Sequence, residues 1–232
     1  MNTAFKIFSL TLLLASCAAT SGKEKQADVK LSLTDRVQAQ VVEMQKNVTE
    51  SLPDEIAGLK SVEPVADREQ NQRGAGFTRA YTADDIVATV FVYNNQNFGV
   101  PDEIDQNMEA LMDKHLQEIQ AMQDSGLYSN VKTGTKKPRT FRWRGVNYQV
   151  LEADVQFNQR DEAKKSLLVL GTNKDLMTYV RIRYTYPKSK QAEINKKHAV
   201  FTRTVFVLCM ISPPRKKRRL LNKFPGSLKE SA

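Results

Sequence analysis

Hydrophobic and polar positions follow two different periods along residues 31–212. Apolar residues recur every three or four positions in three segments, which predicts helices at 33–48, 101–126 and 189–208. Elsewhere the period is two, which predicts strands at 61–66, 77–81, 86–93, 141–143, 151–157, 166–170 and 178–186. Short polar turns separate the last four strands, so we expect an antiparallel meander. The pattern predicts a single α+β domain with helices packed on an antiparallel sheet.

Several local expectations follow from this pattern. Pro101, followed by two acidic residues, is expected to open the second helix. Segment 133–137 is expected to form a hairpin turn. Arg181 and Arg183 are expected to pair with Glu152 and Asp154 across the sheet, because opposite charges on neighbouring strands attract.

The predicted helix at 33–48 has an apolar face with a spacing typical of coiled coils. The spacing lasts for less than two heptads, which favours docking of the helix on its own domain. The alternative is an envelope component that assembles with copies of itself through this helix.

The first seventeen residues carry a different signal. Lys6 precedes an apolar run at 7–14 that is too short to span a bilayer, and Leu14, Ala15, Ser16 and Cys17 follow. This order resembles the lipobox signal peptide of bacterial lipoproteins. The resemblance implies removal of residues 1–16, acylation of Cys17 and attachment to the membrane of the cell envelope. An ordinary secretory signal is the alternative.

The residue after the cysteine is Ala18, where the lipoprotein family uses Asp for retention in the inner membrane. The resemblance therefore implies the outer membrane, facing the periplasm, if the host is diderm. Residues 17–30 are small, polar and charged, and are expected to form a flexible tether. The globular domain is expected at 31–212.

The formal net charge of +9 is unevenly distributed along the chain. Residues 213–232 hold seven basic side chains against Glu230 alone, whereas the predicted domain is close to neutral. This distribution argues against a nucleic-acid partner. The tail is interpreted either as a disordered basic arm that rests on anionic lipid or as sequence foreign to the native reading frame.

One basic stretch lies inside the predicted domain. It is a candidate anion-binding site for lipid headgroups or envelope polymers, formed by Lys136, Lys137, Arg139, Arg142 and Arg144 with two interleaved aromatics. The simpler interpretation, which we favour, is a strand with Phe141 and Trp143 buried and its arginines in solvent.

The sequence contains no catalytic motif, and we expect no cofactor and no metal. His115, His198 and Cys209 would form a metal or thiol site if the second and third helices packed together. Separately satisfied histidines and a small buried cysteine are the favoured interpretation. Met108, Met112 and Met122 are expected to fill the core and not to bind copper.

Two resemblances concern the domain. Gly171 to Pro187 (GTNKDLMTYVRIRYTYP) is similar to the closing strand of uncharacterised bacterial secreted and lipoprotein domains. The order of elements loosely resembles the photosystem-II extrinsic P-protein fold. Neither implies catalytic residues. We therefore expect an envelope lipoprotein whose non-catalytic domain binds a ligand, an envelope protein or an anionic polymer.

Overall fold

The computed structural model describes residues 32–210. The predicted signal peptide, the lipobox with Cys17, the tether and the basic tail lie outside the described residues. Residues 33–210 belong to one compact unit. No helix among the described residues is long and apolar enough to cross a membrane.

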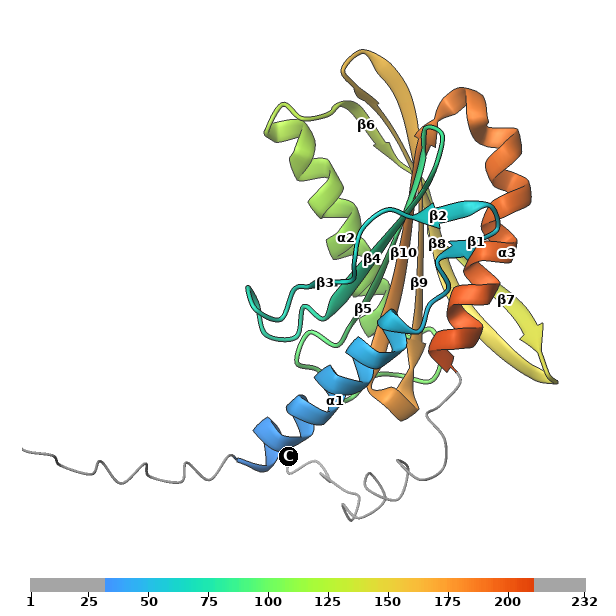
Figure 1. The fold of residues 1–232 in the computed structure, drawn as a ribbon. Coiled ribbons are helices and arrows are strands. Elements are labelled where there is room, and N and C mark those ends of the chain that lie inside the picture. Colours follow the sequence, from blue (N-terminus) through green and yellow to red (C-terminus); the bar gives the residue numbers. More distant parts are fainter. Residues whose placement is uncertain (1–31, 211–232) are drawn as a thin grey trace, which may run out of the picture. The chain divides into compact units, whose positions relative to one another are not determined.

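The unit contains three α-helices, two short 3-10 helices and ten strands (Figure 1). The helices are α1 (Leu33–Glu50), α2 (Gln106–Asp124) and α3 (Gln191–Met210), with η1 (Lys174–Leu176) and η2 (Lys188–Lys190). The strands are β1 (Glu55–Ile56), β2 (Leu59–Ser61), β3 (Ala66–Asp67), β4 (Phe77–Ala83), β5 (Ile86–Tyr93), β6 (Ser129–Thr133), β7 (Lys137–Trp143), β8 (Val146–Gln159), β9 (Glu162–Asn173) and β10 (Thr178–Pro187).

All strands pair antiparallel in one sheet of order β1-β2-β4-β5-β10-β9-β8-β6, while β3 pairs with β4 and β7 with β8. The predicted α+β class is therefore confirmed, and β7, β8, β9 and β10 form the expected four-strand meander. The meander joins the earlier strands through β10, which pairs with β5 from Tyr179 opposite Tyr93 to Thr185 opposite Val87.

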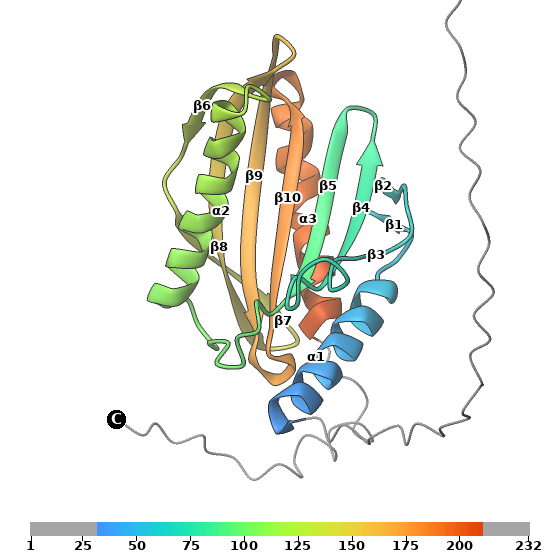
Figure 2. The same ribbon diagram turned by 90° about the vertical axis from the view of Figure 1, so that its left-hand side faces the viewer.

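Helices α2 and α3 cover opposite faces of the sheet (Figures 1 and 2). Met108, Met112 and Ile119 of α2 pack with Leu168 and Leu170 on one face, which we call the α2 face. The α3 face holds the other cluster, to which α3, β1 and β2 contribute. Because successive side chains of a strand point to opposite faces, the central strands supply both clusters.

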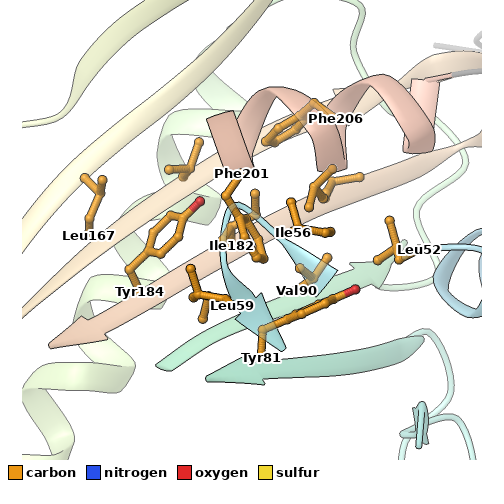
Figure 3. Packing of buried hydrophobic residues seen from close by; sticks show 14 of the residues in the cluster. Leu52, Ile56, Leu59, Tyr81, Val90, Leu167, Ile182, Tyr184, Phe201 and Phe206 are labelled. Atoms are coloured by element: carbon orange, nitrogen blue, oxygen red, sulfur yellow. The ribbon is translucent and has the colours of Figure 1, made fainter. Parts of the chain in front are cut away.

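Aromatic rings dominate the α3 face. Phe201 of α3 packs edge-on against Tyr81 at 5.2 Å and against Tyr184 at 5.5 Å between ring centroids (Figure 3). All three side chains are fully buried. Burying each contributes about 1.5–3 kcal/mol, so this cluster accounts for a large share of the stability of the fold.

Close packing of α3 depends on a glycine in β9. A Cβ atom built at Gly171 would lie 2.3 Å from Cε1 of Phe206, far inside van der Waals contact. Glycine is therefore required here for steric reasons, because the helix approaches the strand so closely.

Several local predictions were wrong. The second helix begins at Gln106, because Asp105 caps it by accepting a hydrogen bond of 2.8 Å from the Met108 amide, so Pro101 lies outside the helix. Segment 133–137 is not a hairpin turn: β6 and β7 both pair with β8, and the Gly134 amide continues the pairing to the Asp154 carbonyl at 2.7 Å.

The expected ion pairs across the sheet are also absent from the described residues. Glu152 lies opposite Val169 and Asp154 opposite Leu167, both on the α3 face. Arg181 lies opposite Leu170 and therefore points to the α2 face, as does Arg183. The predicted alternation of β10 is confirmed, but its two arginines and the two acidic residues of β8 lie on opposite sides of the sheet.

Candidate functional site

A cavity of about 340 Å³ opens on the α2 face, between α2, the strands β5 and β10, and two loops. We call it the His115 pocket. Its lining residues come from loop 68–75, from β5 and the loop after it, from α2 and from β10; they are Arg68, Asn71, Gln72, Ala75, Phe91, Tyr93, Asn95, Lys114, His115, Glu118 and Arg181.

The sheet register and the helix period bring the central residues of the pocket together. Arg181 lies directly opposite Phe91 in the β5–β10 pair, and its guanidinium carbon lies 4.0 Å from the centre of that ring. His115 follows Met108 and Met112 on the buried stripe of α2, and it is 6% exposed. Glu118 lies one turn further along the helix, at the rim.

Loop 68–75 forms the rim of the pocket on the side opposite Glu118, and hydrogen bonds within the loop fix its backbone. The carboxylate of Glu69 accepts hydrogen bonds from the amides of Gly74 at 2.9 Å and Gly76 at 2.6 Å. Gly76 has φ +65°, and a Cβ atom there would lie 1.9 Å from the Val92 carbonyl oxygen, so the loop packs directly on β5. The pocket is therefore bounded by backbone that its own hydrogen bonds keep in place.

Four polar side chains form a hydrogen-bonded network in the pocket. The Tyr93 hydroxyl lies 2.7 Å from Nε2 of His115. Nδ1 of His115 lies 3.0 Å from the Glu118 carboxylate and 2.5 Å from Nη1 of Arg181. The same guanidinium nitrogen lies 3.4 Å from Glu118.

Nδ1 of His115 faces two groups with opposite requirements. A guanidinium only donates hydrogen bonds, and an ionised carboxylate only accepts them. With its proton on Nδ1, the neutral ring donates to Glu118 and accepts from Tyr93; with its proton on Nε2, it accepts from Arg181 and donates to Tyr93. A change of tautomer therefore changes which partner the ring holds.

The pKa values in the network follow from burial and charge. Burial lowers the pKa of His115, and Arg181 lowers it further, although the bond to Glu118 opposes the shift. The hydrogen bond from His115 lowers the pKa of Glu118 to about 2, with Arg181 contributing in the same direction. Burial raises the pKa of Tyr93 well above its usual range. At neutral pH the network therefore contains a neutral imidazole, a carboxylate and a protonated phenol.

This arrangement is suited to binding an anion. Arg68, Lys114 and Arg181 carry positive charge in the pocket lining, against Glu118 alone. Nε of Arg181 is buried without a hydrogen-bond partner in the described structure. The Tyr93 phenol keeps its proton near neutral pH, because burial raises its pKa.

A second hollow continues from the His115 pocket. It measures about 530 Å³ and shares Gln72, Asn95 and Lys114 with the pocket. The Tyr179 hydroxyl on its wall accepts a hydrogen bond of 3.1 Å from the Asn97 side chain. The two hollows give a polar groove along the α2 face, which is long enough for more than a single small ion.

The candidate anion-binding residues of the sequence do not gather in the His115 pocket. Lys136 reaches α2, where it pairs with Asp113 at 2.8 Å, whereas Arg139 pairs with Glu152 at 3.2 Å on the α3 face. Lys137, Arg142 and Arg144 are exposed. Phe141 and Trp143, which we expected to be buried, are only half-buried.

The hypothetical site of His115, His198 and Cys209 is wrong. His115 belongs to α2, and the other two belong to α3 on the opposite face of the sheet. Nδ1 of His198 donates to the Ile194 carbonyl at 2.9 Å. Cys209 is 1% exposed, and burial raises its pKa to about 12, as expected of a small buried residue. No group of three metal-ligating side chains occurs within 32–210.

Sequence reasoning missed Tyr93, Glu118 and Arg181 as site residues. Arg181 was predicted to lie with Arg183 on one face of its strand. Periodicity alone does not show which helix covers that face, so the contact of Arg181 with α2 could not be predicted. His115 in the apolar stripe of α2 was the available signal, because a polar side chain on a buried stripe needs a buried partner.

Comparisons with known proteins add little to this geometry. No family model matches the chain, and the comparison with curated proteins finds no relative. The chain is similar to the solution structure of cyanobacterial PsbP (CyanoP) from Synechocystis sp. PCC 6803, with a TM-score of 0.40 and 8% identity. The similarity covers 64% of this chain and 85% of that chain, and no residue role is transferred from it.

Proposed function

We propose that this chain is a lipid-anchored envelope lipoprotein whose domain binds a small organic anion in the His115 pocket and does not catalyse a reaction. The excess of positive charge around Arg181, beside the Phe91 and Tyr93 rings, is the observation that carries the binding role. The order Leu14, Ala15, Ser16 and Cys17, which resembles a lipobox, is the observation that supports the lipid anchor. In a diderm host the protein would face the periplasm from the outer membrane.

The geometry favours a carboxylate or phosphate attached to an apolar or aromatic group. A guanidinium provides paired donors for such an anion, and the nearby rings provide an apolar wall. The exposed Glu118 at the rim would repel an anion that carries charge at both ends, so a single anionic group is favoured.

Self-assembly through α1 receives less support. Val41, Gln38 and Gln45 of α1 are buried, and their face lies against the domain. Gln38 exchanges hydrogen bonds with Asn94, and Gln45 donates to Thr178. On the apolar face that would join two copies, Val41 is buried, Val37, Met44 and Val48 are half-buried, and Leu33 is exposed. Most of that face is therefore covered by the same chain.

The anchor is tested by metabolic labelling with a fatty acid, followed by membrane fractionation. We expect label on the wild type, none on Cys17→Ala, and full label on Cys209→Ala, which removes the chain's other cysteine. Label that persists on Cys17→Ala would overturn the anchor without affecting the pocket.

The binding role is tested by thermal unfolding in the presence of benzoate, phenyl phosphate and inorganic phosphate. A ligand that binds only the folded state raises Tm as its concentration exceeds Kd. We expect a larger rise with phenyl phosphate than with inorganic phosphate, and a smaller response for Arg181→Gln and for the exposed rim variant Lys114→Gln. Arg139→Gln, on the other face, is the matched control. An equal response in all four proteins would overturn the proposal.

A further inference from the structure

The hairpin formed by β7 and β8 has an apolar tip that projects from the sheet (Figure 1). Trp143 lies opposite Val146 across a two-residue turn, in which Arg144 has φ 47° and Gly145 has φ 82°. Two positive φ values are typical of a tight hairpin turn. This turn places the chain's one tryptophan at the tip.

One face of this hairpin is apolar from the core outward. Phe141 packs on Phe206 of α3 with ring centroids 6.1 Å apart, and it stacks on Tyr148 at 5.4 Å. Trp143 and Val146 continue the same face beyond them, and Val146 is 51% exposed. The apolar strip therefore reaches the tip, where the elements within 32–210 leave Trp143 half-buried and Val146 exposed.

The charge around this strip has a single sign. Residues 136–151 contain five basic side chains and no acidic one. Lys136 and Arg139 pair with acids elsewhere in the domain, but Arg142 and Arg144 near the tip are exposed. The guanidinium carbon of Arg144 lies 4.5 Å from the centre of the Trp143 ring.

We propose that the hairpin tip, residues 141–148, docks on an anionic lipid surface. Trp143 and Val146 enter the interface between headgroups and acyl chains, and Arg142 and Arg144 contact lipid phosphates. Tryptophan favours this interface, and each nearby basic residue strengthens attachment to anionic lipid about fivefold. The proposal rests on the lipid anchor for its biological setting, because the anchor keeps the tip close to a membrane.

The position of the tip agrees with this setting. Both figures place the β7–β8 turn in the half of the domain that also holds the start of α1. Fully extended, the chain from Cys17 to Leu33 spans roughly 55 Å. This length is an upper limit on the distance between the anchor and Leu33.

Trp143 itself reports the contact, because it is the only tryptophan in the sequence. The acylated mature protein, residues 17–232, is reconstituted in vesicles of phosphatidylcholine alone and in vesicles with equal amounts of phosphatidylcholine and phosphatidylglycerol. We expect a blue shift of Trp143 emission and quenching by brominated lipid, both larger with phosphatidylglycerol. Protein that floats with both kinds of vesicle while Trp143 stays unquenched would overturn the docking and leave the anchor intact.

A second measurement does not depend on the anchor. Full-length Cys17→Ala protein is titrated with the same anionic vesicles, and substitutions are added to this parent so that contributions from other segments cancel. Arg142→Gln with Arg144→Gln should bind about 25-fold more weakly. Arg139→Gln, in the same strand but paired with Glu152, should bind almost as the parent does.

Equal binding of these proteins would overturn the role of the arginines. A blue shift that grows with protein concentration in the absence of vesicles would show that a second copy covers the tip, and would also overturn the proposal.

Discussion

A long helix covers each face of the sheet, but the side chains that line the two faces differ in polarity. The α3 face holds the larger apolar and aromatic cluster, around Phe201, in which Tyr184 also bonds to Thr202 at 2.8 Å; its charged residues, Glu152 and Asp154, come from β8. The α2 face combines methionines and leucines with the charged network of His115, Glu118 and Arg181. The α3 face provides most of the apolar stability, and the α2 face gives up part of its apolar area to a polar pocket.

The largest expected effect is on the α3 face. Phe201→Ala should lower the free energy of unfolding by about 3–5 kcal/mol, because it leaves a cavity between Tyr81 and Tyr184. Urea unfolding measures the change. Val200→Ala, one residue earlier on the exposed side of α3, is the control and should change stability by less than about 0.5 kcal/mol. Similar losses in both variants would contradict the distinction between the faces.

A second substitution tests how closely α3 packs. Gly171→Ala should cost about 1–3 kcal/mol, since the new methyl group meets the Phe206 ring. Adding Phe206→Leu should recover part of this loss, and a double-mutant cycle in urea measures the coupling. Purely additive losses would mean that the ring is not the obstacle.

The α2 face should respond to acid through His115. Its pKa is lowered in the folded state, so the unfolded state binds more protons as the pH falls below the ordinary value of 6.5, and stability decreases there. His115→Gln should lose about 1–2 kcal/mol at pH 7 with its hydrogen bonds, and it should lose less further stability between pH 7 and 5 than the wild type. Urea unfolding across this range measures both changes.

His198→Gln leaves His115 in place and should therefore keep the pH dependence that His115 causes. A wild-type profile that matches His115→Gln below pH 6.5 would contradict the burial of this imidazole. Glu118 acts in the same direction at lower pH, because the stability from its lowered pKa is present above its ordinary value and is lost as the pH falls toward 2.

The smallest expected effect concerns the surface contact between α2 and the sheet edge. Lys136→Gln removes the ion pairs with Asp113 and Glu109 and should cost about 0.2–1 kcal/mol, less at high salt. Lys137→Gln, at an exposed neighbouring position, is the control and should be close to neutral. A loss that does not depend on salt would show that Lys136 acts through packing.

The sequence was sufficient for the fold class, the three helices and the long strands, and insufficient for the short strands and for the arrangement that makes the site. The strand predicted at 61–66 does not form as one element, because β2 ends at Ser61 and β3 begins at Ala66. The period of three to four residues identified the helices, and the alternation of β10 correctly separated Ile182 from Arg181. Which helix covers which face depends on pairings such as Tyr93 with Tyr179, far apart in the chain, and no local pattern encodes them. The predicted start of α2 was wrong for a local reason. Both Pro101 and Asp105 have residue types common at helix starts, and the N-cap formed at Asp105.

The pairing of β10 with β5 has a consequence for the order of folding. These strands lie in opposite halves of the chain, and α3, which closes one face, follows β10 in sequence. During synthesis from the N-terminus, β5 can pair with β4 on one side, but its other edge stays unpaired until β10 has been made. Contacts between such distant segments make folding slow and cooperative. The domain is therefore expected to complete its fold only after the whole of it has been synthesised and released.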